Sequence, residues 1–216
     1  DYDDILNLLK AKSVLGWVNC WRRMVPYYQQ MQGKLGSEVS FEASGNGYGL
    51  GSNGIHLLDF FMMTAGSSEI ELSNDELEQE VLESKRSGYV EFMGSLEGST
   101  PQNDKMKIEC LEGDYTTISY TIESAQARYS IVEHGQSHAI CSESLAESDW
   151  MAEETRIELS YQSDLTQHIV DELLATDSCE LPSLEESTGF HKSYISNFIE
   201  FQKSVGYSQD DKCMIT

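Results

Sequence analysis

The segment of residues 45–66 reads GNGYGLGSNGIHLLDFFMMTAG and is the most informative part of this chain. Its first ten residues contain five glycines, too many for the interior of a strand or helix, which predicts a loop with unusual backbone angles. A helix is expected next, with Asn53 as its N-cap and Gly66 as its C-terminal stop. Apolar residues surround most of that helix and indicate that it is buried: Ile55, Leu57, Leu58, Phe60, Phe61, Met62, Met63 and Ala65.

His56 and Asp59 interrupt this apolar surface three residues apart, so they lie on neighbouring positions of one helical side. A buried imidazole or carboxylate needs a hydrogen-bond partner or a wet cleft. The first turn of a helix disfavours imidazolium, so a His56 placed there would suit a proton acceptor. The alternative is a structural His–Asp pair that closes the start of the helix against the loop.

Together, the glycine-rich loop, the pattern G-x-H-x-x-D and the closing T-x-G resemble the C-terminal domain of the Gfo/Idh/MocA superfamily of sugar oxidoreductases. The run VNCWRRMVPYYQQMQ at residues 18–32 resembles the strand and helix that follow the cofactor domain in those enzymes. Residues 83–98 and 161–187, with the closing helix around His191, resemble a branch associated with capsular and surface polysaccharide synthesis.

This resemblance implies that residues 1–216 form a single substrate-binding and oligomerisation domain of an NAD(P)-dependent sugar or nucleotide-sugar oxidoreductase. A Rossmann domain that binds NAD or NADP is then expected upstream of residue 1, with no cofactor bound to this fragment and no activity without that domain. His56 would be the catalytic acid/base. The residues expected to contact the sugar or nucleotide-sugar substrate are Asn46, Tyr48, Ser52, Asn53, Asp59, Arg22, Arg23 and Tyr27.

The sequence departs from the family pattern at Ser52, where these enzymes commonly carry an aspartate four residues before the histidine. Serine cannot hold a negative charge against an imidazole, so assistance to His56 would have to come from Asp59 or be absent. A noncatalytic module for dimerisation or glycan binding, with its ancestral site decayed at Ser52, is therefore the alternative function.

Alternation along residues 38–43, 89–96, 105–111, 116–122, 127–133 and 139–143 predicts strands, the last five of them as an antiparallel meander. Helices are expected over residues 3–12, 22–35, 165–176 and 194–205, the last preceded by a capping box at Ser183. The fold class is therefore α+β, a large, mostly antiparallel sheet covered by helices on one face. Its exposed face is a candidate surface for a homo-oligomer, and the tail from residue 208 is expected to fray.

The composition narrows the function, since 37 acidic against 14 basic residues give a net charge of −23. Such a surface repels nucleic acid and anionic membranes. An anionic nucleotide-sugar would need a positive patch, for which Arg22, Arg23 and Lys34 are candidates, although ordinary helix charges explain them equally well. No apolar run approaches the roughly 20 residues that span a bilayer, so no membrane association is expected.

The sequence offers no metal site or complete dinucleotide site. Five scattered cysteines without C-x-x-C favour neither zinc nor a disulfide framework and fit a reducing cytoplasm, and the histidines at 134 and 138 fit a hairpin tip better than metal ligands. The glycines of residues 45–54 precede a helix, but a strand-turn-helix unit and a downstream acidic residue are not expected. Five polar residues near the last two helices are expected mainly to form hydrogen bonds at helix starts, with the lining of a site as the second interpretation: Gln162, Ser163, Thr166, Glu186 and His191.

Overall fold

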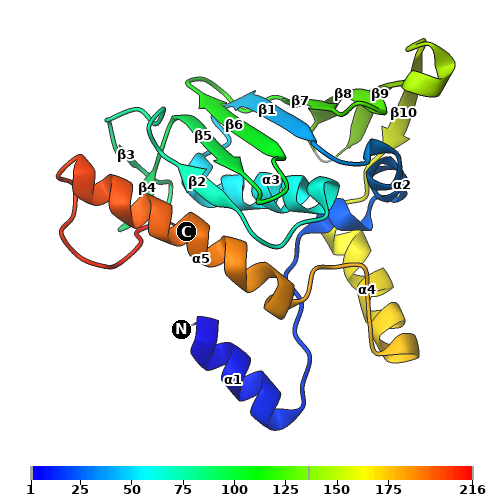
Figure 1. Cartoon of the computed structure of the whole chain (residues 1–216). Helices are drawn as coiled ribbons and strands as arrows, with labels where there is room; N and C mark the ends of the chain where they lie inside the picture. Colours follow the sequence, from blue (N-terminus) through cyan, green and yellow to red (C-terminus); the bar gives the residue numbers. More distant parts are fainter. Residues whose placement is uncertain (1, 136, 216) are drawn as a thin grey trace.

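The computed structural model describes residues 2–135 and 137–215, and it folds them around one broad sheet with helices on one side (Figure 1). In chain order the helical elements and strands are α1 (Tyr2–Lys12), η1 (Trp21–Met24), α2 (Pro26–Leu35), β1 (Ser40–Asn46), α3 (Leu50–Ala65), β2 (Glu71–Ser73), β3 (Leu82–Glu83), β4 (Val90–Glu91), β5 (Gly94–Ser99), β6 (Lys105–Leu111), β7 (Ile118–Glu123), β8 (Ala127–His134), β9 (His138–Leu145), η2 (Ala146–Ser148), β10 (Ala152–Glu158), α4 (Gln162–Thr176) and α5 (Leu184–Ser204).

Within the described residues, eight strands form the main sheet in the order β10-β9-β8-β7-β1-β6-β5-β2. β1 is inserted between β7 and β6, so Ala43 lies opposite Tyr120 on one side and Ile108 on the other. The pairing is antiparallel throughout except for β1 with β6, which are parallel. The mostly antiparallel sheet is confirmed. The prediction of a simple meander is wrong, since β1 separates β6 from β7. Such pairing of an early strand with later ones leaves no local signal in the sequence.

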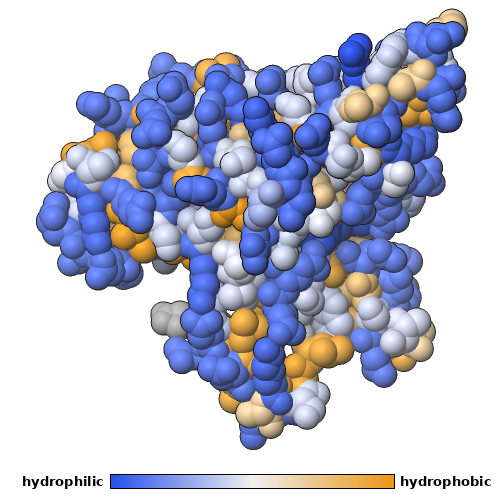
Figure 2. Space-filling model, viewed as in Figure 1, coloured by the Kyte–Doolittle hydropathy of each residue, from blue (hydrophilic) through white to orange (hydrophobic). Residues whose placement is uncertain are grey.

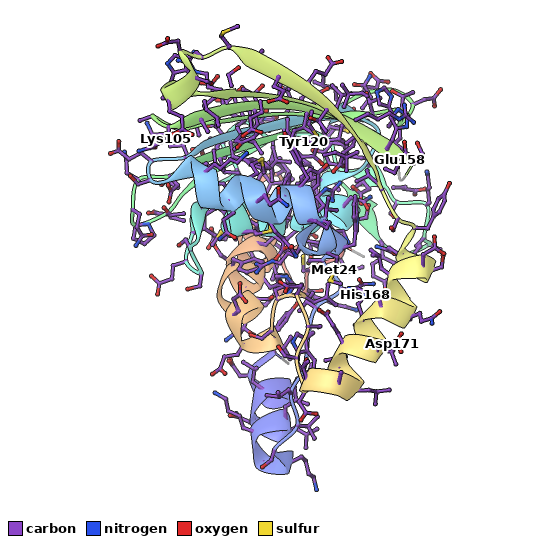
Figure 3. The ribbon with its side chains drawn as sticks, turned by 90° about the vertical axis from the view of Figure 1, so that its right-hand side faces the viewer. Met24, Lys105, Tyr120, Glu158, His168 and Asp171 are labelled. Atoms are coloured by element: carbon purple, nitrogen blue, oxygen red, sulfur yellow. The ribbon has the colours of Figure 1, made fainter. Side chains whose placement is uncertain are left out.

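Among the described residues, helices cover one face of the sheet. Buried and exposed residues alternate strictly along β7, as expected for a strand with one face in the core. α3 contacts β6 and α2 contacts β8, and Figure 3 shows these helices gathered beneath the sheet. The open face carries polar residues such as Glu42, Thr121 and Arg128. The α+β class with helices on one face is confirmed.

Aromatic side chains fill the layer between α3 and the sheet. The ring centroid of Phe41 on β1 lies 5.6 Å from that of Phe60 and 5.7 Å from that of Phe61. Tyr120 on β7 lies 5.4 Å from Phe60 in an edge-to-face arrangement. Full burial of each such side chain contributes roughly 1.5–3 kcal/mol. The apolar surface read from the sequence is thus the surface that fastens α3 to the sheet.

The α3 helix begins earlier than its glycines indicate. Its N-cap is Gly49, with a φ of 80°, so the expected N-cap at Asn53 is wrong. Gly54 lies inside the helix because Tyr194 packs against it: a Cβ there would come within 2.4 Å of the tyrosine hydroxyl. The expected stop at Gly66 is confirmed, since this residue caps the helix in the left-handed region with a φ of 63°.

The C-terminal part is more ordered than expected. Ser183 is confirmed as the N-cap, because its Oγ accepts a hydrogen bond from the Glu186 N–H at 3.0 Å and α5 starts at once, whereas the Glu186 carboxylate bonds to Arg23 at 2.6 Å in place of the reciprocal bond of a capping box. The helix therefore begins ten residues before the expected residue 194. The expectation that the tail frays is wrong, since the Val90 N–H donates to the Met214 carbonyl at 2.8 Å and Ile215 packs against the core.

Candidate functional site

A cavity of about 510 Å³ opens where α3 meets the turn that follows β1. Residues from many separate segments line it, among them η1, the turn at residues 47–49, α3 and the start of α4. Four of the residues proposed from the sequence come together here: Arg22, Tyr48, Asn53 and His56. The remaining lining residues are Trp21, Gly47, Leu57, Lys85, Tyr115, Ile118, Gly135 and Gln162.

His56 is partly buried and faces this cavity from the second turn of α3, not from the first turn as expected. Its Nδ1 atom lies 3.9 Å from the Sγ of Cys20. Among the described residues none hydrogen-bonds to Nε2, and this atom is not enclosed, so Nε2 is the nitrogen that solvent reaches. Burial, with a smaller effect of the Arg22 charge, lowers the pKa of His56 to about 4. The ring is therefore neutral near pH 7 and can accept a proton.

Arg22 reaches the cavity from a buried ion pair with Glu133. The guanidinium donates from Nε at 3.1 Å and from Nη2 at 2.6 Å to the two carboxylate oxygens. The hydroxyls of Tyr28 and Tyr120 also donate to Glu133, at 3.0 and 2.8 Å. Burial alone would lower the pKa of Arg22, but the Glu133 carboxylate outweighs this effect and raises it. Arg22 is thus a permanently charged, rigid part of the cavity wall.

Asp59 and Arg23, which were expected to contact substrate, do not line this cavity. Asp59 has no exposed surface, and its carboxylate accepts hydrogen bonds from Arg23 at 2.8–3.1 Å. Arg23 also bonds to Glu186 at 2.6 Å. His56 and Asp59 lie one turn apart on α3, where Asp59 pairs with Arg23 of η1 and His56 lines the cavity. The Arg23 guanidinium bonds to both Asp59 and Glu186 and so ties η1, α3 and α5 together.

Asn46, Ser52 and Tyr27 also lie outside the lining of the cavity. Asn46 is exposed at the end of β1, and Ser52 lies in the first turn of α3. Tyr27 packs its ring against Tyr129 at 6.5 Å, beneath the sheet. In the sequence, Asn46 and Ser52 belong to the glycine-rich segment and Tyr27 lies close to Arg22. Position in the sequence alone does not show which side of a turn or helix faces the cavity.

Trp21, Lys85 and Tyr115 are lining residues that sequence reasoning missed. The Arg22 guanidinium lies 4.6 Å from the centroid of the Trp21 ring, a cation–π arrangement. Lys85 and Tyr115 come from the connections before β4 and before β7, where no periodic pattern marks a site. Gln162, weighed as a lining residue from the sequence, does line the cavity, whereas Glu186 and His191 do not.

The charge of the lining contrasts with that of the whole chain. Lys85 is cationic, Arg22 keeps its charge but is paired with Glu133 behind the wall, and none of the described lining residues is an aspartate or glutamate. The chain as a whole has 37 acidic and 14 basic residues. Low-dielectric walls focus the field of such charges into a cleft. The cavity is therefore suited to an anionic or strongly polar ligand.

The glycine-rich turn joins β1 to α3 and so does form a strand-turn-helix unit, contrary to the expectation from the sequence. A dinucleotide still does not fit there. The N-terminus of a helix attracts phosphate through free backbone N–H groups, but here Glu91 Oε2 accepts from the Gly51 N–H at 3.0 Å. Its negative charge takes the place that a pyrophosphate would need.

A metal centre is equally unsupported over residues 2–135 and 137–215, where no group of three histidine, cysteine, aspartate or glutamate side chains is placed to hold an ion. His134 and His138 stack at 4.7 Å on the β8–β9 hairpin. Over the same residues no helix is long and apolar enough to cross a membrane.

Comparison with known proteins identifies the fold. No family model and no curated protein matches the sequence. A mutant of KijD10, a 3-ketoreductase from Actinomadura kijaniata in complex with TDP-benzene and NADP, superposes with a TM-score of 0.63 at 15% identity, over 89% of this chain and 63% of that one. For UDP-N-acetylglucosamine 3-dehydrogenase GnnA from Acidithiobacillus ferrooxidans the TM-score is 0.65 at 8% identity, over 91% and 64%.

A third solved structure is a super-repressor mutant of Gal80p from Saccharomyces cerevisiae, with a TM-score of 0.61 at 15% identity over 94% of this chain and 68% of that one. The chain spans less than two thirds of the length of KijD10 and GnnA. These similarities lie in the arrangement of the elements and not in the sequence. The chain thus has the fold of the C-terminal domain of the Gfo/Idh/MocA oxidoreductases.

Proposed function

We propose that this chain is the substrate-binding half of an NAD(P)-dependent oxidoreductase that acts on a sugar, and more specifically on a nucleotide-sugar. The observation that carries the proposal is the cavity at His56, whose described lining holds the cation Lys85, the Glu133-paired Arg22 and no carboxylate in a strongly acidic chain. The diphosphate of a nucleotide-sugar would lie against Lys85, which has no carboxylate partner among the described residues. The two bacterial proteins of similar fold act on or bind nucleotide-linked ligands by their descriptions, which supports the same substrate class.

His56 supplies the acid/base chemistry of this proposal. A neutral imidazole whose Nε2 opens on the cavity accepts the proton of a sugar hydroxyl within hydrogen-bond reach. A bound nicotinamide would supply the hydride acceptor for the carbon of that hydroxyl. The nicotinamide would be held by a separate Rossmann domain, because Glu91 closes the N-terminus of α3 to a dinucleotide.

The surface for that domain is proposed to be the apolar end of the molecule formed by α1 and α4. Neither helix contains a buried residue, and large apolar side chains on and beside them are exposed: Ile5, Leu8, Val14, Leu15, Val170 and Leu174. Figure 2 shows apolar side chains gathered at this lower end. Exposed patches of this kind mark interaction surfaces, and the enzymes of similar fold are longer than this chain.

Two further parts of the proposal concern the biological setting. The sequence resemblance to the capsular and surface polysaccharide branch supports, as a proposal, a reaction in polysaccharide biosynthesis. The open face of the sheet is proposed as the surface of a homo-oligomer, whose contacts would be largely polar. Light scattering of the purified chain gives its mass in solution, and a monomer at high concentration would contradict the oligomer.

A noncatalytic role is the second candidate. The structure of similar fold from Saccharomyces cerevisiae is described as a super-repressor mutant of Gal80p, and Ser52 stands where the family commonly has an aspartate. This alternative requires a ligand or partner without turnover. It would be favoured by tight glycan binding that is insensitive to substitution of His56.

Titration calorimetry of the chain with UDP-sugars, TDP-sugars and the free sugars tests the proposed substrate class. Saturable binding of the nucleotide-sugars is expected, weakened about tenfold by Lys85→Gln because one charge-assisted contact is lost. Lys105→Gln removes the same charge from β6, outside the cavity, and should leave the affinity unchanged (Figure 3). Equal weakening by both substitutions, or no binding at all, would overturn the proposal.

A further inference from the structure

The side-chain amide of Asn53 is held by its nitrogen atom. Asn53 lies in the first turn of α3, where its exposed side chain lines the cavity. Its Nδ2 atom donates one hydrogen bond to the backbone carbonyl of Tyr48 and a second to Oγ of Ser52, the latter at 3.1 Å. A primary amide nitrogen carries two hydrogens, so both donors of Asn53 are used within the chain.

These two contacts decide which end of the amide is free. A backbone carbonyl oxygen can only accept a hydrogen bond, so the end of the amide at Tyr48 must be the nitrogen. The reverse orientation would bring Oδ1 against another oxygen atom. Over residues 2–135 and 137–215, no group donates to Oδ1 of Asn53. Asn53 therefore brings to the cavity an oxygen that can accept a hydrogen bond and no hydrogen that it can donate.

Ser52 takes part in this orientation. It stands where the enzymes of this family commonly carry an aspartate, and its hydroxyl oxygen accepts from the Asn53 amide. Tyr48, which provides the other acceptor, precedes the N-cap Gly49, so the amide also fastens the glycine-rich turn to α3. The serine thereby acts on the cavity through Asn53.

His56 lies one helical turn beyond Asn53, and both residues line the cavity. Residues three apart on a helix are neighbours, with about 5–6 Å between their Cβ atoms. Side chains on a helix lean toward its N-terminus, so the His56 ring extends toward the turn that carries Asn53. In the proposed function His56 accepts the proton of the reacting hydroxyl. Oδ1 of Asn53 is then a second acceptor beside it, suited to a second hydroxyl.

We propose that Asn53 is a specificity-determining residue whose Oδ1 accepts a hydrogen bond from the hydroxyl next to the one that reacts, so that the substrate is a sugar with two hydroxyls on adjacent carbons. The role of His56 in this inference rests on the proposed function, whereas the orientation of the Asn53 amide is a property of the chain alone. Because Asn53 has no donor left, a carbonyl or ether oxygen on that carbon cannot replace the hydroxyl.

Titration calorimetry with UDP-glucose and its deoxy and deoxyfluoro analogues, each altered at one ring hydroxyl, tests this inference. At one ring position both analogues should bind about tenfold more weakly than UDP-glucose, because neither hydrogen nor fluorine can donate to Oδ1. In Asn53→Ala this difference should disappear at that position, and at an adjacent position it should disappear in His56→Ala. Gln162→Ala is the matched control, since it removes another amide from the cavity lining and should keep both differences.

Three results would overturn the inference and leave the proposed substrate class intact. One is that every analogue binds as tightly as UDP-glucose, which is decisive even if Asn53→Ala does not fold. Another is that a deoxyfluoro analogue binds as tightly as UDP-glucose at the position sensitive to Asn53→Ala. The third is an undiminished difference in folded Asn53→Ala. No binding of UDP-glucose would also overturn the inference, and no binding of any nucleotide-sugar would overturn the proposed function as well.

Hydrogen exchange measured by 1H–15N NMR checks the amide in the chain without ligand. The Nδ2 hydrogens of Asn53 should exchange with solvent several-fold more slowly than those of Asn7, an exposed residue of α1. Equal exchange at the two residues would show that the Asn53 amide turns freely and would overturn the inference whatever the result with UDP-glucose.

Discussion

The carboxylate of Glu91 caps α3 from outside the helix, its Oε2 accepting the backbone N–H of Gly51 at 3.0 Å across forty residues of sequence. Burial raises the pKa of Glu91, while hydrogen bonds from Ser52 and from backbone N–H groups oppose the shift. This contact attaches the start of the His56 helix to β4. It also supplies the negative charge that the first turn of a helix favours.

Replacing this cap should destabilise the protein. Glu91→Ala leaves backbone N–H groups of α3 without their partner, and we expect a loss of about 1–2 kcal/mol in the free energy of unfolding. Glu91→Gln keeps an acceptor oxygen but not the charge and should lose about half as much. Urea denaturation gives both values, and Glu97→Ala, a change at a partly exposed residue of β5, is the control. Equal stability of Glu91→Ala and Glu97→Ala would contradict the cap.

The buried pair of Arg22 and Glu133 should be far more sensitive than an exposed pair. Glu133→Ala leaves a guanidinium without its counter-charge at a site where Arg22 is 6% exposed, and a loss of about 3–5 kcal/mol is expected. Lys107→Ala breaks an exposed pair with Glu97 at 3.4 Å and should cost less than about 1 kcal/mol. Thermal or urea unfolding measures both, and similar losses would show that the buried pair contributes little.

Stability should fall as the pH is lowered from 7 to 4 through His56 and His191. Burial lowers the pKa of each to about 4, so between pH 6.5 and 4 the unfolded chain binds protons that the folded chain does not. Each ring can contribute up to roughly 3 kcal/mol of this loss, and protonation of one disfavours that of the other. The raised pKa values of Asp59 and Glu91 act in the opposite direction.

Comparing the unsubstituted chain with His56→Asn separates the contribution of the His56 ring to this pH dependence from the contributions of the Asp59 and Glu91 carboxylates. Its unfolding free energy should depend less steeply on pH between 6.5 and 4 than that of the unsubstituted chain. His168→Asn, at an exposed position on α4, should keep the original dependence (Figure 3). Parallel pH profiles for the unsubstituted chain and His56→Asn would refute the burial effect on His56.

Catalysis, in a protein that carries the proposed Rossmann domain, should depend on His56. His56→Asn removes the proton acceptor, so kcat for nucleotide-sugar oxidation should fall about 10²–10⁴-fold with KM little changed. Nicotinamide absorbance follows the reaction, with His168→Asn as the control. Equal turnover by the unsubstituted protein and His56→Asn would remove the imidazole from the mechanism.

Local patterns predicted the elements of this fold better than their assembly. The strand at Lys105–Leu111, the cap at Ser183 and the stop at Gly66 follow from alternation, side-chain hydrogen bonding and glycine geometry, and the structure has all three. The start of α3 was misjudged because Gly54 is dictated by Tyr194, about 140 residues away, and not by its neighbours.

The site was predicted only in part for a similar reason. Helical spacing placed His56 and Asp59 near each other, but it did not show that Arg23 would take up the carboxylate. Lys85 and Tyr115 come from connections without periodicity, so their place in the cavity depends entirely on tertiary structure. The absence of carboxylates from the described lining, beside the cation Lys85, likewise emerges only when distant segments meet.

The insertion of β1 between β6 and β7 also limits when the centre of the sheet can form during synthesis. Residues 40–46 leave the ribosome more than sixty residues before either neighbouring strand is complete, so both edges of this strand wait unpaired during synthesis. Fragments that end before β6 therefore lack both partners of β1, and an unpaired strand of this kind is prone to aggregation.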